Sequence, residues 1–157
     1  MASIDYNMIY QSFYMKVEAF DFLELDENTV QEFLCNWIHA SVRPTYIRNI
    51  FSSVSFDDDI MRLTYEMRYP REDFEDEDFV IEILALGMGI QWLSPKVNSL
   101  VNLRQVYASK EEKYYSQSTH LAELKDLLSS WKKEQRRMIA DRGYIHNAYV
   151  NMEELMT

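Results

Sequence analysis

The chain has 157 residues, of which 47% are apolar, and its formal net charge is −10. This length and apolar content suit one domain with a single hydrophobic core. Three Gly and three Pro leave little room for the many tight turns of an all-β sandwich, whereas long runs of Leu, Ile, Met, Glu and Lys favour helices. The single cysteine, Cys35, excludes an intrachain disulfide, and we expect no secretory signal because the N-terminus lacks a basic segment followed by an apolar core.

The charge is unevenly distributed along the chain. Residues 1–93 hold 18 acidic and 6 basic side chains, whereas residues 94–157 hold 8 acidic and 10 basic side chains. A plain solvated surface accounts for most charge runs. The asymmetry nevertheless predicts a polarised molecule with an acidic end and a mildly basic end.

Two amphipathic helices are predicted in the N-terminal part. Asp5 is a candidate N-cap for the first, whose apolar residues recur at helical spacing. Asn28, with Gln31 three residues later, resembles a capping box and starts the second helix. Pro44 ends that helix because the residue before a proline avoids helical geometry.

The segment that follows is the least helical part of the sequence. Leu63, Tyr65 and Met67 alternate with polar residues, a period of two that predicts a half-exposed strand over residues 60–67. Since a lone strand is not stable, it needs a partner, either residues 51–56 in a hairpin or a strand from another subunit. We expect the acidic turn of such a hairpin to project from the helical body.

Residues 79–93, FVIEILALGMGIQWL, are apolar on nearly every side of a helix and must therefore be enclosed. The run is shorter than the roughly 20 apolar residues that cross a bilayer, so we expect a central core helix and no membrane. Asp76 or Asp78 is its candidate N-cap. Ser94–Pro95 is predicted to stop this helix and to begin a shorter one that ends near Leu103.

The C-terminal third is predicted to hold a polar link, residues 109–120, and then the longest helix, from about Leu121 to Asp141, capped by Gly143. Six residues are expected on its inner side: Leu124, Leu127, Leu128, Trp131, Met138 and Ile139. Aromatic and apolar residues continue past this helix, which predicts that residues 143–157 form a docking tail. The predicted fold is therefore mainly α, a bundle of about five helices in one domain, residues 1–142, with a β-strand or hairpin insertion at about 51–70 and an extended C-terminal tail.

Two apparent motifs do not predict a cofactor or a catalytic site. Gly87-Met88-Gly89 is not a dinucleotide fingerprint, because it lies inside a helix and Trp92 stands where the third glycine belongs. Ala85 and Gly89 instead form a small-residue face on which another helix can pack. Cys35 and His39 lie one helical turn apart, but nothing in the sequence marks a third residue, which favours a core thiol.

The remaining residues give no metal-ligand pattern either. The three histidines, His39, His120 and His146, share no ligand spacing with Cys or acids. We therefore expect no enzyme, no cofactor and no metal.

Five blocks occur in a characteristic order along the chain: YQSFYMKVEAFDFLELDENTVQEFLCNWIHASVRP, SSVSFDDD, FVIEILALGMGIQWLSPKVNS, EKYYSQSTHLAELKDLL and DRGYIHNAY. In this order the chain resembles a family of small structural proteins encoded among the head and neck genes of tailed bacteriophages of Gram-positive hosts. The resemblance covers nearly the whole chain and rests on the collinear order of the blocks.

The resemblance implies a head–tail connector, or adaptor, in the neck of the virion, made in the host cytoplasm. Such a protein forms a homo-oligomeric ring, twelvefold in this expectation, that contacts the portal protein and the next neck or tail protein. DNA passes through its lumen without sequence-specific binding. Other interpretations stay open: another neck or tail-completion protein, an acidic DNA-mimic inhibitor, or a small regulatory scaffold module.

The connector interpretation assigns two sets of residues. The candidates for contacts with the portal or a neighbouring copy are Tyr144, Ile145, Tyr149, Val150, Leu63, Tyr65 and Met67. The candidates for the DNA channel are Asp57, Asp58, Asp59, Glu75 and Asp76. An acidic lining would repel DNA, whereas a basic lining would hold it by counterion release.

Overall fold

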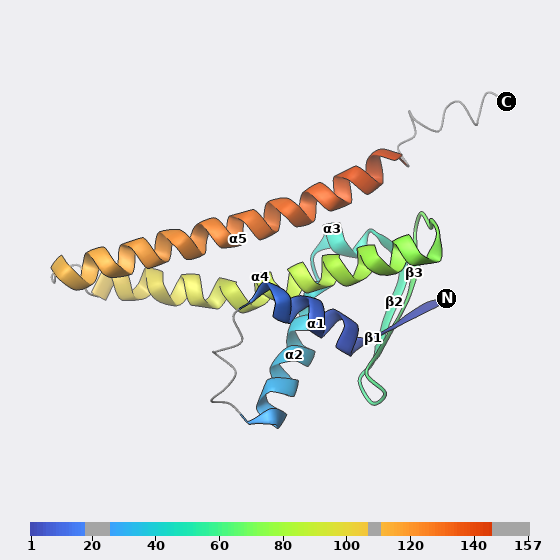
Figure 1. Ribbon diagram of the computed structural model, residues 1–157, viewed down its shortest axis with the longest axis horizontal. Helices are drawn as coiled ribbons and strands as arrows, with labels where there is room; N and C mark the ends of the chain where they lie inside the picture. The colour runs from blue at the N-terminus through green and yellow to red at the C-terminus, as the bar shows by residue number, and fades with distance from the viewer. Residues whose placement is uncertain (18–25, 107–110, 146–157) are drawn as a thin grey trace.

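The computed structural model describes residues 1–17, 26–106 and 111–145. It contains five helices and one three-stranded antiparallel sheet (Figure 1), which confirms the predicted fold class. The elements in chain order are β1 (Ala2–Asp5), α1 (Tyr6–Lys16), α2 (Glu27–Ser41), α3 (Thr45–Arg48), β2 (Phe51–Asp57), β3 (Arg62–Met67), α4 (Asp73–Val106) and α5 (Glu111–Ile145).

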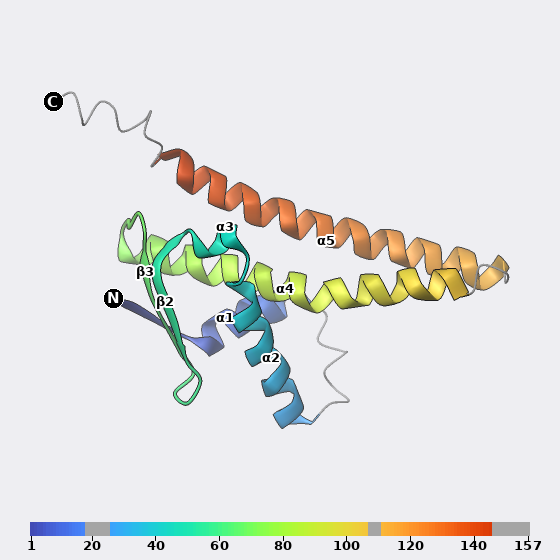
Figure 2. The same ribbon diagram turned by 180° about the vertical axis from the view of Figure 1, so that it is seen from behind.

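The architecture is built on α4, which contacts α1, α2 and α5. α5 runs antiparallel to α4 along one side of it, while α1, α2 and the sheet gather on the other side around the N-terminal half of α4 (Figures 1 and 2). The far end of the α4–α5 pair extends beyond these elements as an arm. The molecule is therefore a compact head with a long helical projection.

The sheet has the strand order β1-β3-β2, with β3 in the centre. β2 and β3 form the predicted hairpin, and the register pairs Val54 with Tyr65 and Asp57 with Arg62. β1 pairs with the other edge of β3, placing Ala2 opposite Tyr65. This third strand was not predicted, because four residues are too few to establish an alternating pattern.

The ends of α1 and α2 are set by aspartates. Asp5 caps α1 as predicted, its carboxylate accepting from the Asn7 N–H at 3.1 Å. The N-cap of α2 is Asp26, which accepts from the Thr29 N–H at 3.1 Å, so the prediction of Asn28 is wrong. Asn28 lies inside the first turn, where its side chain does not cap.

The centre of α4 is buried on all sides, as its sequence requires. Every residue from Ile83 to Ile90 is buried, with α1 and α2 on one side and α5 on the other. A Cβ on Gly87 would lie 2.8 Å from Cβ and 3.3 Å from Cα of Ser41, so α2 approaches α4 closely at this residue. A Cβ on Gly89 would lie 3.1 Å from the Trp131 ring of α5. The predicted packing role of Gly89 is therefore consistent with the structure, but the closest helix approach is at Gly87.

A buried amide connects α3, α4 and α5. Gln135 of α5 is 1% exposed; its side-chain N–H donates to the Ile83 carbonyl at 3.0 Å, and its oxygen accepts from the Tyr46 hydroxyl at 2.9 Å. Both polar ends of this amide are thus paired, so that burial does not leave an unsatisfied group. Tyr46 lies in α3, the short helix between α4 and α5 in Figure 1.

The boundaries of α4 differ from the prediction at both ends. The helix begins at Asp73, before Asp76 and Asp78, and it passes through Pro95 without ending. Proline removes one helical hydrogen bond and usually interrupts a helix. Here α4 continues with α5 alongside it (Figures 1 and 2), and just before the proline the Ser94 hydroxyl donates to the Ile90 carbonyl at 2.7 Å.

α5 is longer than predicted. It begins at Glu111, so most of the expected polar link is helical, and it passes through Gly143 to Ile145. Glu, Lys and Gln are good helix formers, and a partner helix stabilises a polar segment that periodicity alone would leave as a loop. Leu127, expected inside, is 37% exposed.

The segment Asp73–Ser99 is long and apolar enough to span a membrane, but 61% of its most apolar window is buried within the protein itself. A core helix of a soluble protein passes the same length and composition test.

Candidate functional site

The strand residues predicted to contact another subunit belong to the core of this chain. Leu63, Tyr65 and Met67 are 0%, 2% and 5% exposed. The predicted alternation is present in β3, but the face that these three side chains form belongs to the protein's own core. The assignment of these three residues to an interface is therefore wrong.

The four predicted interface residues of the tail fall in two places. Tyr144 and Ile145 lie in the last turn of α5, not in an extended tail, because the helix continues to Ile145. Tyr149 and Val150 lie outside the described residues.

The acids predicted to line a DNA channel do not lie together. Asp57, Asp58 and Asp59 lie at the β2–β3 turn, whereas Glu75 and Asp76 lie in the first turn of α4, beyond the opposite end of β3 (Figure 1). All are exposed except Asp76, which is 5% exposed.

Asp76 is half of a buried ion pair between α4 and α5. The Arg142 guanidinium donates to the Asp76 carboxylate and, at 3.1 Å, to the Tyr69 carbonyl, and it lies 4.7 Å from the centre of the Phe79 ring. The second carboxylate oxygen of Asp76 accepts from the Arg71 backbone N–H at 3.0 Å. Asp76 therefore joins the start of α4 to the end of α5, and its assignment to a DNA channel is wrong.

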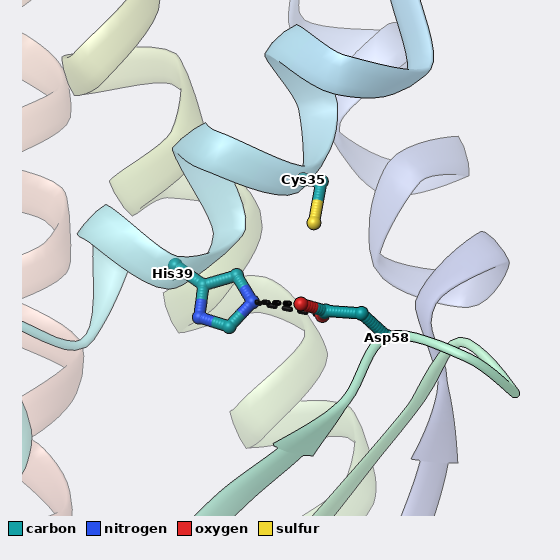
Figure 3. Close-up of side chains that lie close together, drawn as sticks. All are labelled: Cys35, His39 and Asp58. Carbon is teal, nitrogen blue, oxygen red and sulfur yellow. Dashed lines mark hydrogen bonds and ion pairs between the residues drawn. The ribbon is translucent and has the colours of Figure 1, made fainter.

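The β2–β3 turn carries a second polar centre, which the structure forms from three elements. Asp58 extends from the end of β2 toward Cys35 and His39, which lie one turn apart on α2 (Figure 3). His39 Nε2 lies 2.8 Å and 3.1 Å from the two carboxylate oxygens of Asp58. The Tyr6 hydroxyl, at the start of α1, donates to the same carboxylate at 2.6 Å. The ligand atoms of Cys35, His39 and Asp58 all lie within 4.8 Å of one another.

Aromatic packing fixes the geometry of this centre. The His39 ring lies on Phe56, with ring centroids 4.2 Å apart and an interplanar angle of 34°. Tyr6 is 1% exposed, so its ring is held in the core while its hydroxyl reaches the carboxylate. Asp58 is thereby anchored to α1 and α2, so the expectation that this acidic turn projects from the helical body is wrong at Asp58.

The charges of the centre are coupled through Asp58. The hydrogen bond from Tyr6, followed by that from His39, lowers the pKa of the Asp58 carboxyl group. Burial, followed by the hydrogen bond to Asp58 and its negative charge, raises the pKa of Tyr6. Burial, with a further contribution from the charge of Asp58, raises the pKa of the Cys35 thiol.

This arrangement does not activate Cys35 as a nucleophile. In a catalytic cysteine site, the histidine that acts as the base faces the sulfur, and a third side chain orients that histidine. Here Nε2 of His39 faces the Asp58 carboxylate, and burial together with the charge of Asp58 raises the pKa of the Cys35 thiol, which disfavours the thiolate. Thiol, imidazole and carboxylate are, however, all side-chain groups that bind zinc.

Sequence reasoning missed the third member of this centre. The Cys35–His39 spacing was visible, but Asp58 is 19 residues from His39 and reaches it only through the fold of the hairpin. The run Asp57–Asp59 gave no indication of which carboxylate turns inward.

The exposed surface of α5 carries a basic stripe, defined here as Lys125, Lys132, Lys133 and Arg136. These side chains surround a shallow hollow together with Leu128 and Ser129. The spacings of seven and four residues place three of the four on one side of the helix. The Arg136 guanidinium also lies 5.5 Å from the centre of the Tyr46 ring.

A pocket of about 150 Å³ lies between α3 and the ends of α4 and α5, lined by Tyr46, Asn49, Ile50, Tyr69, Phe79, Ile139 and Arg142. Its only charged lining residue, Arg142, already pairs with Asp76.

No protein-family model, no curated protein and no solved structure matches this chain. The relationship to phage neck proteins therefore stays a prediction from the order of sequence blocks.

Proposed function

We propose that this protein is a structural component of a tailed-phage virion, a head–tail connector whose copies form a ring beneath the portal and leave a lumen for DNA. The proposal assigns no enzymatic activity to the chain. It rests on the sequence resemblance together with one structural observation, the α4–α5 arm.

The arm offers far more side surface than the head covers. α4 has 34 residues and α5 has 35, which corresponds to about 50 Å at ~1.5 Å per residue. α1, α2 and the sheet lie against only the N-terminal half of α4, and the rest of the pair extends past them (Figure 2). A long helical projection of this kind suits lateral contacts between copies, because neighbouring arms can pack along their length.

Charge supports a head-to-tail arrangement of the copies. Glu72, directly before α4, and Asp73, Glu75 and Asp78 in its first turns are exposed, whereas α5 exposes the basic stripe. A ring requires two different surfaces on each copy, one complementary to the other. We assign the acidic start of α4 and the basic stripe to these two surfaces, with charge complementarity fixing their orientation.

The lumen in this proposal is lined by the exposed acids of the β2–β3 turn, Asp57 and Asp59. Their repulsion of DNA is multiplied by the copy number of the ring and acts within about 8 Å at physiological ionic strength. The portal contact is assigned to the last turn of α5 and the residues after it.

The test is the assembly state of the chain, alone and co-expressed with the portal protein of the same phage. We expect rings in electron micrographs and a matching mass by light scattering. Lys132→Glu/Lys133→Glu should abolish them, because it reverses half of the basic stripe. Arg62→Glu/Arg68→Glu is the matched control, since it makes the same charge change at two exposed positions, one in β3 and one directly after it.

A chain that stays monomeric with and without the portal would contradict the connector proposal. If that monomer competed with DNA for a DNA-binding protein, the acidic DNA-mimic interpretation would replace it. Rings that persist in Lys132→Glu/Lys133→Glu would preserve the connector but reject the basic stripe as its lateral contact.

A further inference from the structure

We propose that Cys35, His39 and Asp58 form a zinc-binding site that fastens the β2–β3 turn to α2. This inference goes beyond the connector function and does not depend on it, because the site lies within one chain.

The three donors are positioned for chelation. Cys35 and His39 are four residues apart, so both project from one face of α2, the spacing with which helical pairs chelate zinc. Asp58 supplies a carboxylate from a different element, and Figure 3 shows the sulfur and the imidazole both turned toward it. Donors fixed on separate elements form a site only in the folded chain.

The distances between the donor atoms are close to those in a zinc site. Tetrahedral zinc, with bonds of about 2.0–2.3 Å, separates its ligand atoms by about 3.3–3.6 Å. His39 Nε2 lies 2.8 Å from the nearest Asp58 oxygen, and all three donors lie within 4.8 Å of one another. Shifts of a few tenths of an ångström up to about one ångström therefore bring the three donors onto one ion, which side-chain rotation can supply.

Neighbouring side chains hold the donors in place. Metal-bound carboxylates and imidazoles are usually held by further contacts that orient them. The Tyr6 hydroxyl donates to Asp58, and Phe56 packs against the His39 ring. The His39 and Asp58 side chains are 33% and 52% exposed, which leaves an approach for the ion and a fourth position for water.

The donor types select the metal. A thiolate and an imidazole suit zinc, whereas magnesium and calcium prefer sites made wholly of oxygen. In the bound state Cys35 is a thiolate, His39 a neutral imidazole and Asp58 a carboxylate, because metal ligands bind in their deprotonated forms, so zinc displaces the thiol proton of Cys35. Since the site exists only in the folded state, zinc should raise the melting temperature.

The experiment uses the full chain without a polyhistidine tag. Cobalt chloride, as a spectroscopic substitute for zinc, should give an intense tetrahedral visible spectrum and a near-ultraviolet thiolate charge-transfer band at one equivalent. Zinc chloride should raise the melting temperature, and magnesium chloride should not.

Variants assign the effects to residues. Cys35→Ser should abolish the thiolate band and the zinc response, while His120→Ala, at an exposed histidine on α5, should leave both unchanged. Tyr6→Phe should weaken zinc binding by about 10–100-fold, because it removes the group that orients Asp58.

Because the cobalt spectrum is measured on the unaltered chain, it tests the proposal even if a variant fails to fold. A wild-type spectrum without a thiolate band would overturn the proposal, as would a zinc response that survives in folded Cys35→Ser. In either case the centre is a hydrogen-bonded contact without a metal.

Discussion

Gly87 and Gly89 lie two positions apart in α4 but face different neighbours. Gly87 faces the backbone of α2 at Ser41, whereas Gly89 faces the ring of Trp131. A backbone held in a helix cannot move alone, but a side chain can rotate slightly. The two glycines should therefore respond differently to the same added methyl group.

We predict that Gly87→Ala lowers the free energy of unfolding and that Gly89→Ala leaves it nearly unchanged. Overpacking against Ser41 costs about 1–3 kcal/mol, while replacing Gly by Ala within a helix returns about 0.5–1 kcal/mol. At Gly89 the smaller clash is offset by the helical gain. Gly89→Leu, which the Trp131 ring cannot accommodate, should again cost about 1–3 kcal/mol. Urea unfolding of the three variants measures their free energies of unfolding. Equal losses for the two alanine variants would contradict the prediction.

The buried tyrosines predict a loss of stability in alkali. Burial, with smaller contributions from Glu77, Asp76 and Asp73, raises the pKa of Tyr65 from 10.0 to about 12. Between these values the unfolded chain releases the phenolic proton and the native state keeps it, so stability is full below pH 10.0 and falls as the pH rises. The loss attributable to Tyr65 reaches about 2–3 kcal/mol above its native pKa.

Urea unfolding between pH 8 and pH 11, approximate limits chosen to bracket the ordinary tyrosine pKa of about 10, tests this dependence. Tyr65→Phe should show a shallower decline than the unaltered chain. Tyr69→Phe, at an exposed position, should decline like the unaltered chain. Parallel curves for all three proteins would exclude Tyr65 as a source of the effect.

At the level of the helices, the Asp76–Arg142 pair is the contact most sensitive to a single substitution. Its side chains are 7% and 10% exposed, and it joins the first turn of α4 to the last turns of α5. Arg142→Met should cost about 3–5 kcal/mol, because it leaves the Asp76 charge buried without its partner.

The double variant Asp76→Asn/Arg142→Met separates the ion pair from general packing. Removing both charges should restore much of the stability lost in Arg142→Met, since no buried charge then remains. A double-mutant cycle by urea unfolding measures the coupling. Additive losses would show that Arg142 acts through its contacts with Phe79 and the Tyr69 carbonyl instead.

Sequence periodicity correctly predicted the elements whose hydrophobic pattern is visible within their own residues. α1 with its Asp5 cap, the β2–β3 hairpin and the enclosed centre of α4 belong to this group. The errors concern features that depend on contacts with another element of the fold. α4 continues through Pro95 and α5 begins early because each helix supports the other.

The same distinction explains the candidate sites. Alternation identified one face of β3 but could not say whether that face meets another subunit or the chain's own helices. Charge runs identified the acids, yet the burial of Asp76 depends on Arg142, 66 residues away, and the position of Asp58 depends on Tyr6, 52 residues away. Such long-range partners leave no periodic signal in a single sequence.

For the molecule as a whole, the side chains of the core that the structure describes all precede the last turn of α5. Its buried cluster and the side chains packed against it extend no further than Ile139. If the end of the chain makes the portal contact proposed above, removing residues 146–157 should keep native helix content and melting temperature while preventing incorporation into the particle. Circular dichroism and particle-binding assays measure the two effects. Loss of folding would place these residues in the core, and normal incorporation would reject them as the portal contact.

The position of β3 between β1 and β2 also sets an order of events during folding. β2 and β3 are joined by a four-residue turn and can pair as soon as both exist, whereas β1 must wait for a partner about sixty residues further along the chain. Closing so long a loop is slower than forming a hairpin. During synthesis the N-terminal strand is therefore made first and paired last, and until then the free edge of β3 is open to any other strand that meets it.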